Sequence, residues 1–83
     1  MKVKVLYFAS LREQLGMQGE DLDLSSTTVA GLRALLMARG GAWQKALAPG
    51  RALRMAVNRE MAQPTTPVGP GDEVAFFPPV TGG

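Results

Sequence analysis

A chain of 83 residues with 46% hydrophobic and 19% charged residues has the composition of one small globular domain, not of a disordered protein. Its nine Lys and Arg residues give a net charge of +2, but they are scattered without a basic run, which argues against nucleic-acid binding. The chain has neither Cys nor His, which excludes disulfides, the usual zinc sites and imidazole catalysis. No apolar stretch approaches the roughly 20 residues of a membrane span and no signal-peptide pattern opens the chain, so we expect a cytoplasmic protein without membrane contact.

The first third of the chain predicts a strand, a helical turn and a second strand. Residues 1–8 alternate, which places three side chains in the core: Val3, Val5 and Tyr7. Residues 10–16 predict a short helix that Ser10 caps and Gly16 ends. Residues 19–25 predict a second strand, antiparallel to the first because the connection is short.

The main helix is expected to follow Thr28, whose hydroxyl suits an N-cap, and to end at Gly40 and Gly41. Apolar side chains recur in it at three- and four-residue steps, as in a helix face that packs on a core. That core-facing stripe comprises Val29, Leu32, Leu35 and Leu36.

The second half predicts shorter elements. Residues 42–48 predict a helix with Trp43 as a core residue, and residues 53–57 a third strand. Asn58 and Arg59 suit a tight turn into a short fourth strand around Met61. Residues 63–72, rich in Pro and Gly, predict a loop.

The C-terminus combines a strand, a stiff exit and a bare tail. Residues 74–77 carry two apolar side chains on each face, so both faces of this strand are expected to be covered. Pro78 and Pro79 have no N–H group and end the ladder. The next four residues could reach on the order of 13 Å beyond the body if extended. We therefore expect a domain over residues 1–79 and a flexible tail over residues 80–83, whose terminal carboxylate could be the reacting group.

Strands, one main helix and further strands predict an α+β domain in which a helix covers one face of a mixed sheet. The other face then lacks a helix. By alternation, burial of Val5 and Phe76 turns their neighbours outward. These outward side chains are Leu6, Phe8, Ala75 and Phe77.

The whole chain resembles the small subunit of molybdopterin synthase, a member of the ubiquitin-like sulfur carriers. The most specific part of the resemblance is the ending Phe-Phe-Pro-Pro-Val-Thr-Gly-Gly over residues 76–83. The opening is also similar, with Val-Leu-Tyr-Phe-Ala over residues 5–9 followed by Leu-Arg-Glu over residues 11–13. Thr28-Val29 and Ala56-Val57-Asn58 are similar to that family's helix start and third strand.

This resemblance implies a β-grasp fold whose first and last strands are central, parallel neighbours. It implies that an adenylating enzyme of the ubiquitin-activating type uses ATP to join AMP to the carboxylate of Gly83. A sulfur donor protein then supplies the sulfur that gives a thiocarboxylate. The large synthase subunit, expected in a heterotetramer, takes the tail and uses the sulfur to build the dithiolene of molybdopterin. The chain itself is expected to be no enzyme alone and to bind no cofactor or metal.

The resemblance also implies the site residues. The carboxylate of Gly83 is the reacting group. Gly82 has no Cβ, so it keeps the tail narrow enough to enter a closed channel in the partner. Arg12 is a candidate polar contact at the rim of the partner surface. The residues expected to contact the partner are Leu6, Phe8, Arg12, Met61, Ala75, Phe77, Pro78, Pro79, Val80 and Thr81.

Two other functions remain open from the sequence. A related carrier could serve thiamin, cysteine or thiolated-tRNA synthesis with the same tail chemistry. A protein modifier could instead join its tail to lysines of other proteins. The Phe-Phe-Pro-Pro run over residues 76–79 favours the molybdopterin reading over the first of these.

Overall fold

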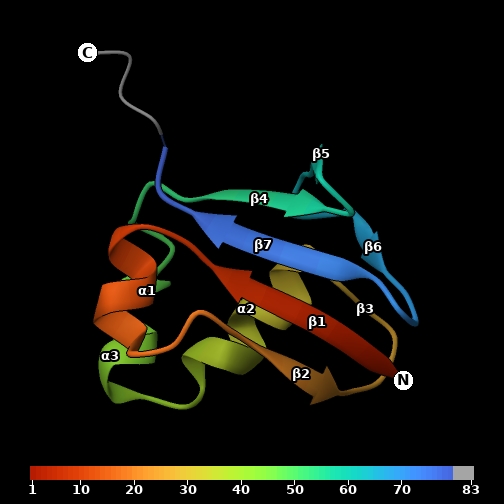
Figure 1. Ribbon diagram of the computed structural model, residues 1–83, viewed down its shortest axis with the longest axis horizontal. Helices are drawn as coiled ribbons and strands as arrows, with labels where there is room; N and C mark the ends of the chain where they lie inside the picture. The colour runs from red at the N-terminus through yellow and green to blue at the C-terminus, as the bar shows by residue number, and fades with distance from the viewer. Residues whose placement is uncertain (80–83) are drawn as a thin grey trace.

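The computed structural model describes residues 1–79, so the expectations for Val80, Thr81, Gly82 and Gly83 lie outside the described residues. The chain forms a five-stranded sheet, a two-stranded sheet and three helices within that range (Figure 1). In chain order the elements are β1 (Lys2–Tyr7), α1 (Ser10–Leu15), β2 (Gly19–Asp23), β3 (Thr27–Thr28), α2 (Val29–Met37), α3 (Gly41–Ala46), β4 (Arg54–Val57), β5 (Glu60–Met61), β6 (Pro67–Val68) and β7 (Glu73–Phe77).

The main sheet has the strand order β2-β1-β7-β4-β5. The first and last strands are its parallel central pair, with Val5 opposite Val74 and Leu6 opposite Ala75, and every other pairing is antiparallel. This confirms the α+β, β-grasp arrangement that the resemblance implied. Because β1 and β7 run the same way, both end at the same edge of the sheet, which is where the tail begins.

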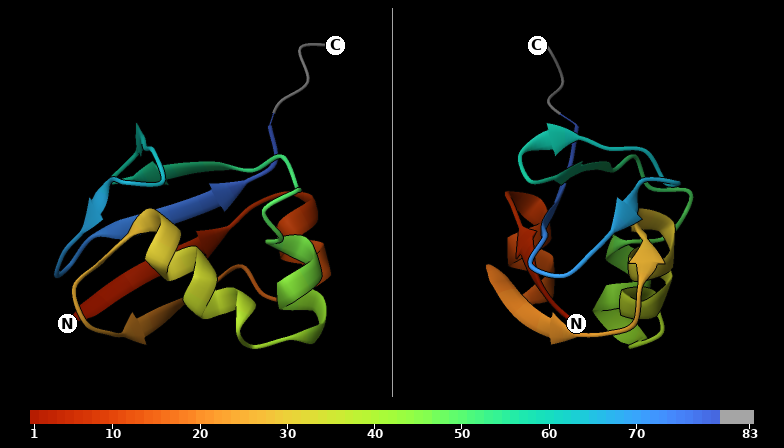
Figure 2. Two further views of the ribbon diagram at one scale, coloured as in Figure 1. Left: turned by 180° about the vertical axis from the view of Figure 1, so that it is seen from behind. Right: turned by 90° about the vertical axis from the view of Figure 1, so that its right-hand side faces the viewer.

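The helices cover one face of the sheet only. In Figure 1 the sheet faces the viewer with α2 behind it, and in Figure 2, seen from behind, α2 lies in front of the strands. The core between these layers is apolar throughout and includes the three side chains predicted from β1. Its fully buried members are Val3, Val5, Tyr7, Val29, Leu32, Leu36, Leu47, Val74 and Phe76.

Helix α2 begins as predicted, since the amide of Gly31 donates to the hydroxyl of Thr28 at 3.1 Å. The expected stripe is wrong at one position: Leu35 is 49% exposed. At 3.6 residues per turn, Leu35 falls at the margin of the face that Leu32 and Leu36 share. Gly31 leaves room for β3, because a Cβ at this position would collide with the hydroxyl of Thr27 unless that side chain moved.

Two helix boundaries also differ from expectation. Ser10 does not cap α1; the N-cap is Ala9, with φ 54° and no side-chain capping bond, whereas Gly16 ends α1 as predicted, with φ 73°. Gly40 does not end α2 directly, because α2 ends at Met37 and Gly40 is the N-cap of α3. A residue with positive φ therefore precedes each of the two short helices, Ala9 before α1 and Gly40 before α3, and neither helix has a side-chain capping bond at its N-terminus.

The predicted loop over residues 63–72 contains a strand. Pro67 and Val68 of β6 pair antiparallel with Thr27 and Thr28 of β3, and Val68 is buried. A two-residue strand that includes Pro shows no alternation, so the local pattern could not indicate it. The pairing closes the core beside the start of α2, where Val29 donates to the carbonyl of Thr66 at 3.0 Å.

A polar clamp ties the sheet to the far end of the helices. Glu20 on β2 accepts two bonds from the guanidinium of Arg39, at 2.8 and 2.9 Å, and one from the hydroxyl of Tyr7 at 2.9 Å. Arg39 lies 4.4 Å above the ring of Trp43, which meets Tyr7 edge-on. The Arg39 hydrogen bonds hold the pKa of Glu20 below its usual value, while burial and the bond to Glu20 raise the pKa of Tyr7.

The clamp predicts an acid-dependent stability. Because the folded pKa of Glu20 is lowered, its contribution is complete above its unfolded pKa of about 4.5 and is lost as the pH falls through the folded value. We expect Glu20→Gln to lower the free energy of unfolding by about 1–2 kcal/mol at pH 7, as for charge-assisted hydrogen bonds, and by less at pH 3. Urea denaturation from pH 3 to 7 measures both values, with Asp21→Asn as the exposed control. An equal loss at both ends of that range would contradict the clamp.

Candidate functional site: the open sheet face and the start of the tail

The sheet face without helices carries an apolar patch. The register aligns one row across four strands, because Leu6 pairs with Ala75, Ala75 with Ala56 and Ala56 with Met61. Directly paired residues share a face, so all four side chains lie on the open face. Phe77, two residues after Ala75, extends the same face toward the tail. We call Leu6, Phe8, Ala56, Met61, Ala75 and Phe77 the open-face patch.

The outward facing predicted for Leu6, Phe8, Ala75 and Phe77 is confirmed, whereas their role in binding a partner stays a prediction. Phe8 is 48% exposed and Met61 is 61% exposed, and both are among the large apolar side chains that the described part of the chain leaves in contact with water. Ala75 and Phe77 are half-buried, whereas their neighbours Val74 and Phe76 are fully buried. In the isolated chain, therefore, only one face of β7 is fully covered, and the expectation that both faces would be covered is wrong.

The open face is not apolar throughout. One row further from the tail, Lys4 pairs with Asp21 on one side and with Glu73 on the other. Glu73 also lies 3.9 Å from the guanidinium of Arg59. The face is thus divided into a charged half and an apolar half, and the apolar half is the one next to the end of β7.

Phe8 is presented by a fixed backbone although its side chain is exposed. Its amide donates to the carbonyl of Phe76 at 3.2 Å, and its carbonyl accepts from the amide of Leu11 at 3.1 Å. The turn between them depends on Ala9, whose φ of 54° is costly for a residue with a Cβ. The ring of Phe8 is therefore attached at a position that folding has already fixed.

The remaining predicted site residues lie around the same edge. Arg12 is exposed on α1, which follows β1 at the tail end of the sheet (Figure 1). Pro78 and Pro79 are half-buried and follow β7, which ends at Phe77 as predicted. Val80, Thr81, Gly82 and Gly83 lie outside the described residues. Sequence reasoning missed Ala56, although alternation from the buried Met55 would have placed it on the open face.

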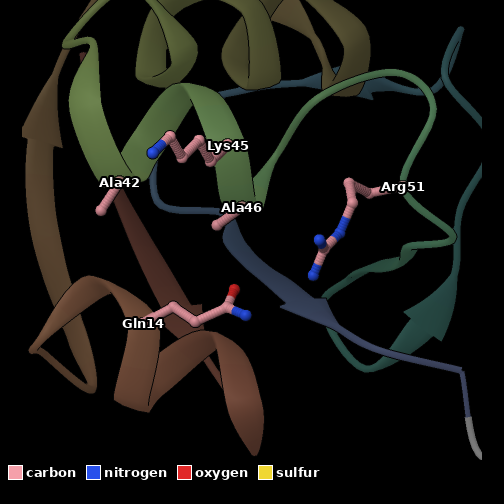
Figure 3. Close-up of a pocket in the computed structure, with 5 residues that line it drawn as sticks. All are labelled: Gln14, Ala42, Lys45, Ala46 and Arg51. Atoms are coloured by element: carbon pink, nitrogen blue, oxygen red, sulfur yellow. The ribbon is translucent and has the colours of Figure 1, made fainter.

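A hollow lies beside this edge, between α1 and α3. The hollow has a volume of about 290 Å³ and is lined by Gln14, Ala42, Lys45, Ala46 and Arg51 (Figure 3).

Within residues 1–79 no three His, Cys, Asp or Glu side chains are grouped as metal ligands. None of the helices in that range is long and apolar enough to cross a membrane.

A mixed sheet with a parallel central pair, a helix across one face and an apolar patch beside the C-terminal exit defines a ubiquitin-like β-grasp protein. Residues 5–83 match the ThiS family, and the chain belongs to that family.

Similar proteins agree with this assignment. The chain is 43% identical to the molybdopterin synthase sulfur carrier subunit of Escherichia coli (strain K12), over 98% of this chain and 99% of that protein. The structure superposes on SAMP1 from Haloferax volcanii, a small archaeal modifier protein, with a TM-score of 0.83 and 27% identity over the full length of both chains. It also superposes on a putative molybdopterin converting factor, subunit 1, from Pyrococcus furiosus. That match has a TM-score of 0.79 and 27% identity over 96% of this chain and 99% of the other.

The facing of the buried and the outward side chains predicts unequal losses of stability when they are truncated. Phe76→Ala empties a fully buried site and should lower the free energy of unfolding by about 3–5 kcal/mol. Phe8→Ala removes a ring that is half in water and should cost less than about 1 kcal/mol. Chemical denaturation of both variants, with Val5→Ala and Phe77→Ala as a second pair, measures the difference. If the Phe8 variant is the less stable of the two, the facing of the sheet is inverted.

Proposed function

We propose that this chain is the sulfur-carrier subunit of a molybdopterin synthase and delivers sulfur as a thiocarboxylate at Gly83. The observation that carries the proposal is the 43% identity, over 98% of the chain, to a molybdopterin synthase sulfur carrier subunit. The family match also extends through the last residue. The chain acts as a subunit of the sulfurtransferase and is not a catalyst on its own.

The tail chemistry follows from the weakness of a carboxylate as an electrophile. An E1-like activating enzyme joins the Gly83 carboxylate to the α-phosphorus of ATP and releases pyrophosphate, so that AMP becomes the leaving group. A hydrosulfide equivalent from a donor protein adds to the acyl carbon and AMP departs. A C–S bond thereby replaces a C–O bond with no change in oxidation state at carbon. ATP is bound by the partner, and only the AMP and the sulfur are covalently attached to this chain.

The composition supports carriage of sulfur at the terminus. The chain has no Cys, so no side chain can hold a persulfide, and the terminal carboxyl is the group left to carry transferable sulfur. Gly82 and Gly83 have no Cβ, which keeps the tail thin enough for a closed channel. Both features suit delivery of the terminus into the active site of another protein.

The open-face patch is the proposed docking surface for the large subunit. Large apolar side chains grouped on an exposed face are typical of interaction sites, and aromatic and Met residues are enriched at interfaces. Phe8 and Phe77 lie beside the point where the tail begins, so docking there aims Gly83 at the partner's active site. Arg12, Pro78, Pro79, Val80 and Thr81 complete the proposed contact surface.

A second function is favoured by one observation, the TM-score of 0.83 to a small archaeal modifier protein. A modifier would share the adenylation step but would end in an isopeptide bond to a lysine of another protein. A carrier for thiamin, cysteine or tRNA thiolation would instead share the thiocarboxylate and differ in its acceptor. The chemical form in which the terminus is recovered separates the modifier from both carriers.

The first test is the mass of the terminus. Incubated with its activating enzyme, ATP and a sulfur donor, the intact protein should gain the mass difference of sulfur for oxygen, because the thioacid replaces one oxygen of Gly83. Mass spectrometry of the intact chain and of its C-terminal peptide measures the gain and locates it. A chain lacking Gly83 and a chain extended beyond Gly83 are the controls, and neither should be modified. A gain that persists in either control, or that maps elsewhere, would refute the sulfur-carrier proposal.

The second test is the docking surface. Phe8→Ala and Phe77→Ala should each weaken binding to the large subunit by about 2 kcal/mol or more, as the loss of a hot-spot side chain does. Leu35→Ala is a matched control, because Leu35 is as exposed as Phe8 but lies on α2, away from the open face. Titration calorimetry gives the three affinities. Binding that survives both Phe substitutions and fails with Leu35→Ala would place the interface on the helical side.

A further inference from the structure

Exposed cations gather at the edge of the sheet where the tail begins. Arg12 lies on α1, Lys45 on α3, Arg51 on the connection to β4 and Arg54 on β4 itself. All four side chains are exposed, and Arg54 pairs directly with Phe77. We call these four residues the cationic rim. The residues of these four segments include one acidic side chain, Glu13 on α1, so the four cations leave this edge with a net positive charge.

The rim is not neutralised within residues 1–79. The ion pairs found there join the N-terminus to Asp23, Arg39 to Glu20 and Arg59 to Glu73, and none of them includes a member of the rim. Like charges brought together without counter-charges repel one another and lower stability. Cations that make no ion pair within the described chain and are exposed to solvent are available to an anionic surface outside it.

Arg51 is carried on a fixed backbone. The guanidinium of Arg33 on α2 donates to the carbonyls of Leu47 and Ala48, both at 2.7 Å, and to that of Arg51 at 3.5 Å. The amide of Arg51 in turn donates to the carbonyl of Ala48 at 2.9 Å. Arg33 therefore holds the connection between α3 and β4 in place and fixes the backbone position from which the Arg51 side chain extends.

Two members of the cationic rim, Lys45 and Arg51, line the hollow between α1 and α3. Figure 3 shows Gln14 and Arg51 reaching toward the same space from two elements, with Ala46 between them and Lys45 on the same helix as Ala46. The hollow has a volume of about 290 Å³, which is enough for one acidic side chain. The guanidinium of Arg51 and the side-chain amide of Gln14, the two groups that reach toward this space, are donors suited to a carboxylate.

We propose that the cationic rim recognises an acidic protein surface around the channel that receives the tail, with one carboxylate side chain of that surface seated in the hollow. This inference rests on the proposed function, because the rim lies at the edge of the sheet where β7 ends and continues the open-face patch through Arg54. The patch supplies apolar contact area, while the rim orients the approach by long-range attraction. The net charge of the chain is only +2 and its sequence has no basic run, so a protein partner is favoured over a nucleic acid.

The test compares two double charge reversals. Lys45→Glu with Arg51→Glu reverses the hollow, and Lys2→Glu with Arg59→Glu makes the same change in net charge at the opposite end of the sheet. Association with the large subunit is measured by stopped flow from 50 to 500 mM NaCl, and thermal unfolding checks that both variants fold. We expect the first variant to associate about tenfold more slowly at 50 mM NaCl and to lose most of its salt dependence. The second should stay within about twofold of the unmodified chain. Sulfur transfer at saturating partner should be unchanged in the second variant.

Three results would overturn the proposal. They are equal effects of the two reversals, an association rate of the unmodified chain that does not depend on salt, and binding of a 20-nucleotide RNA that only the Lys45 and Arg51 reversal abolishes. The proposed function fails separately, if the unmodified chain neither binds the large subunit nor transfers sulfur to it. Normal sulfur transfer together with equal association rates of the two double variants would refute the role of the rim and would leave the proposed carrier function intact.

Discussion

The parallel pairing of β1 with β7 is the constraint on which the rest of the structure depends. Parallel neighbours require a crossover, and every helix of the described chain lies between these two strands in sequence. The pair is anchored by buried contacts of Val5 with Val74 and Tyr7 with Phe76. Because parallel strands end at the same edge, folding the core also brings the end of β1, the start of α1 and the exit to the tail together.

Strand alternation lets two adjacent residues serve different purposes. Phe76 fills the core, and Phe77, the next residue, faces the open side beside Phe8. The open-face patch therefore needs no departure from the pattern that makes the sheet stable, and its position is as fixed as the core beneath it. An interface built in this way is preorganised, so little conformational entropy remains to be lost when a partner covers it.

The charges are divided between fold and surface. Arg39 is committed to Glu20 in a clamp that joins β2 to the connection after α2, and Arg33 is committed to the carbonyls that end α3. The cationic rim makes no such internal pair within residues 1–79. An Arg that is bound on several sides stabilises the chain, whereas one that is exposed and unpaired beside an apolar patch is available to a partner.

The sequence alone determined the features that depend on neighbours along the chain. These were the alternation of β1 and β7, the Thr28 cap, the tight turn at Asn58, the Pro-Pro stop and, through resemblance, the β-grasp fold and the family. Tertiary structure decided what depends on distant pairing. It paired β6 with β3, left Leu35 exposed, placed Ala56 in the patch and gathered the cationic rim from four separate elements. The physical reason is that a cap or an alternation is read within one turn or strand, whereas strand register and the packing of separate elements are set only when the whole core closes.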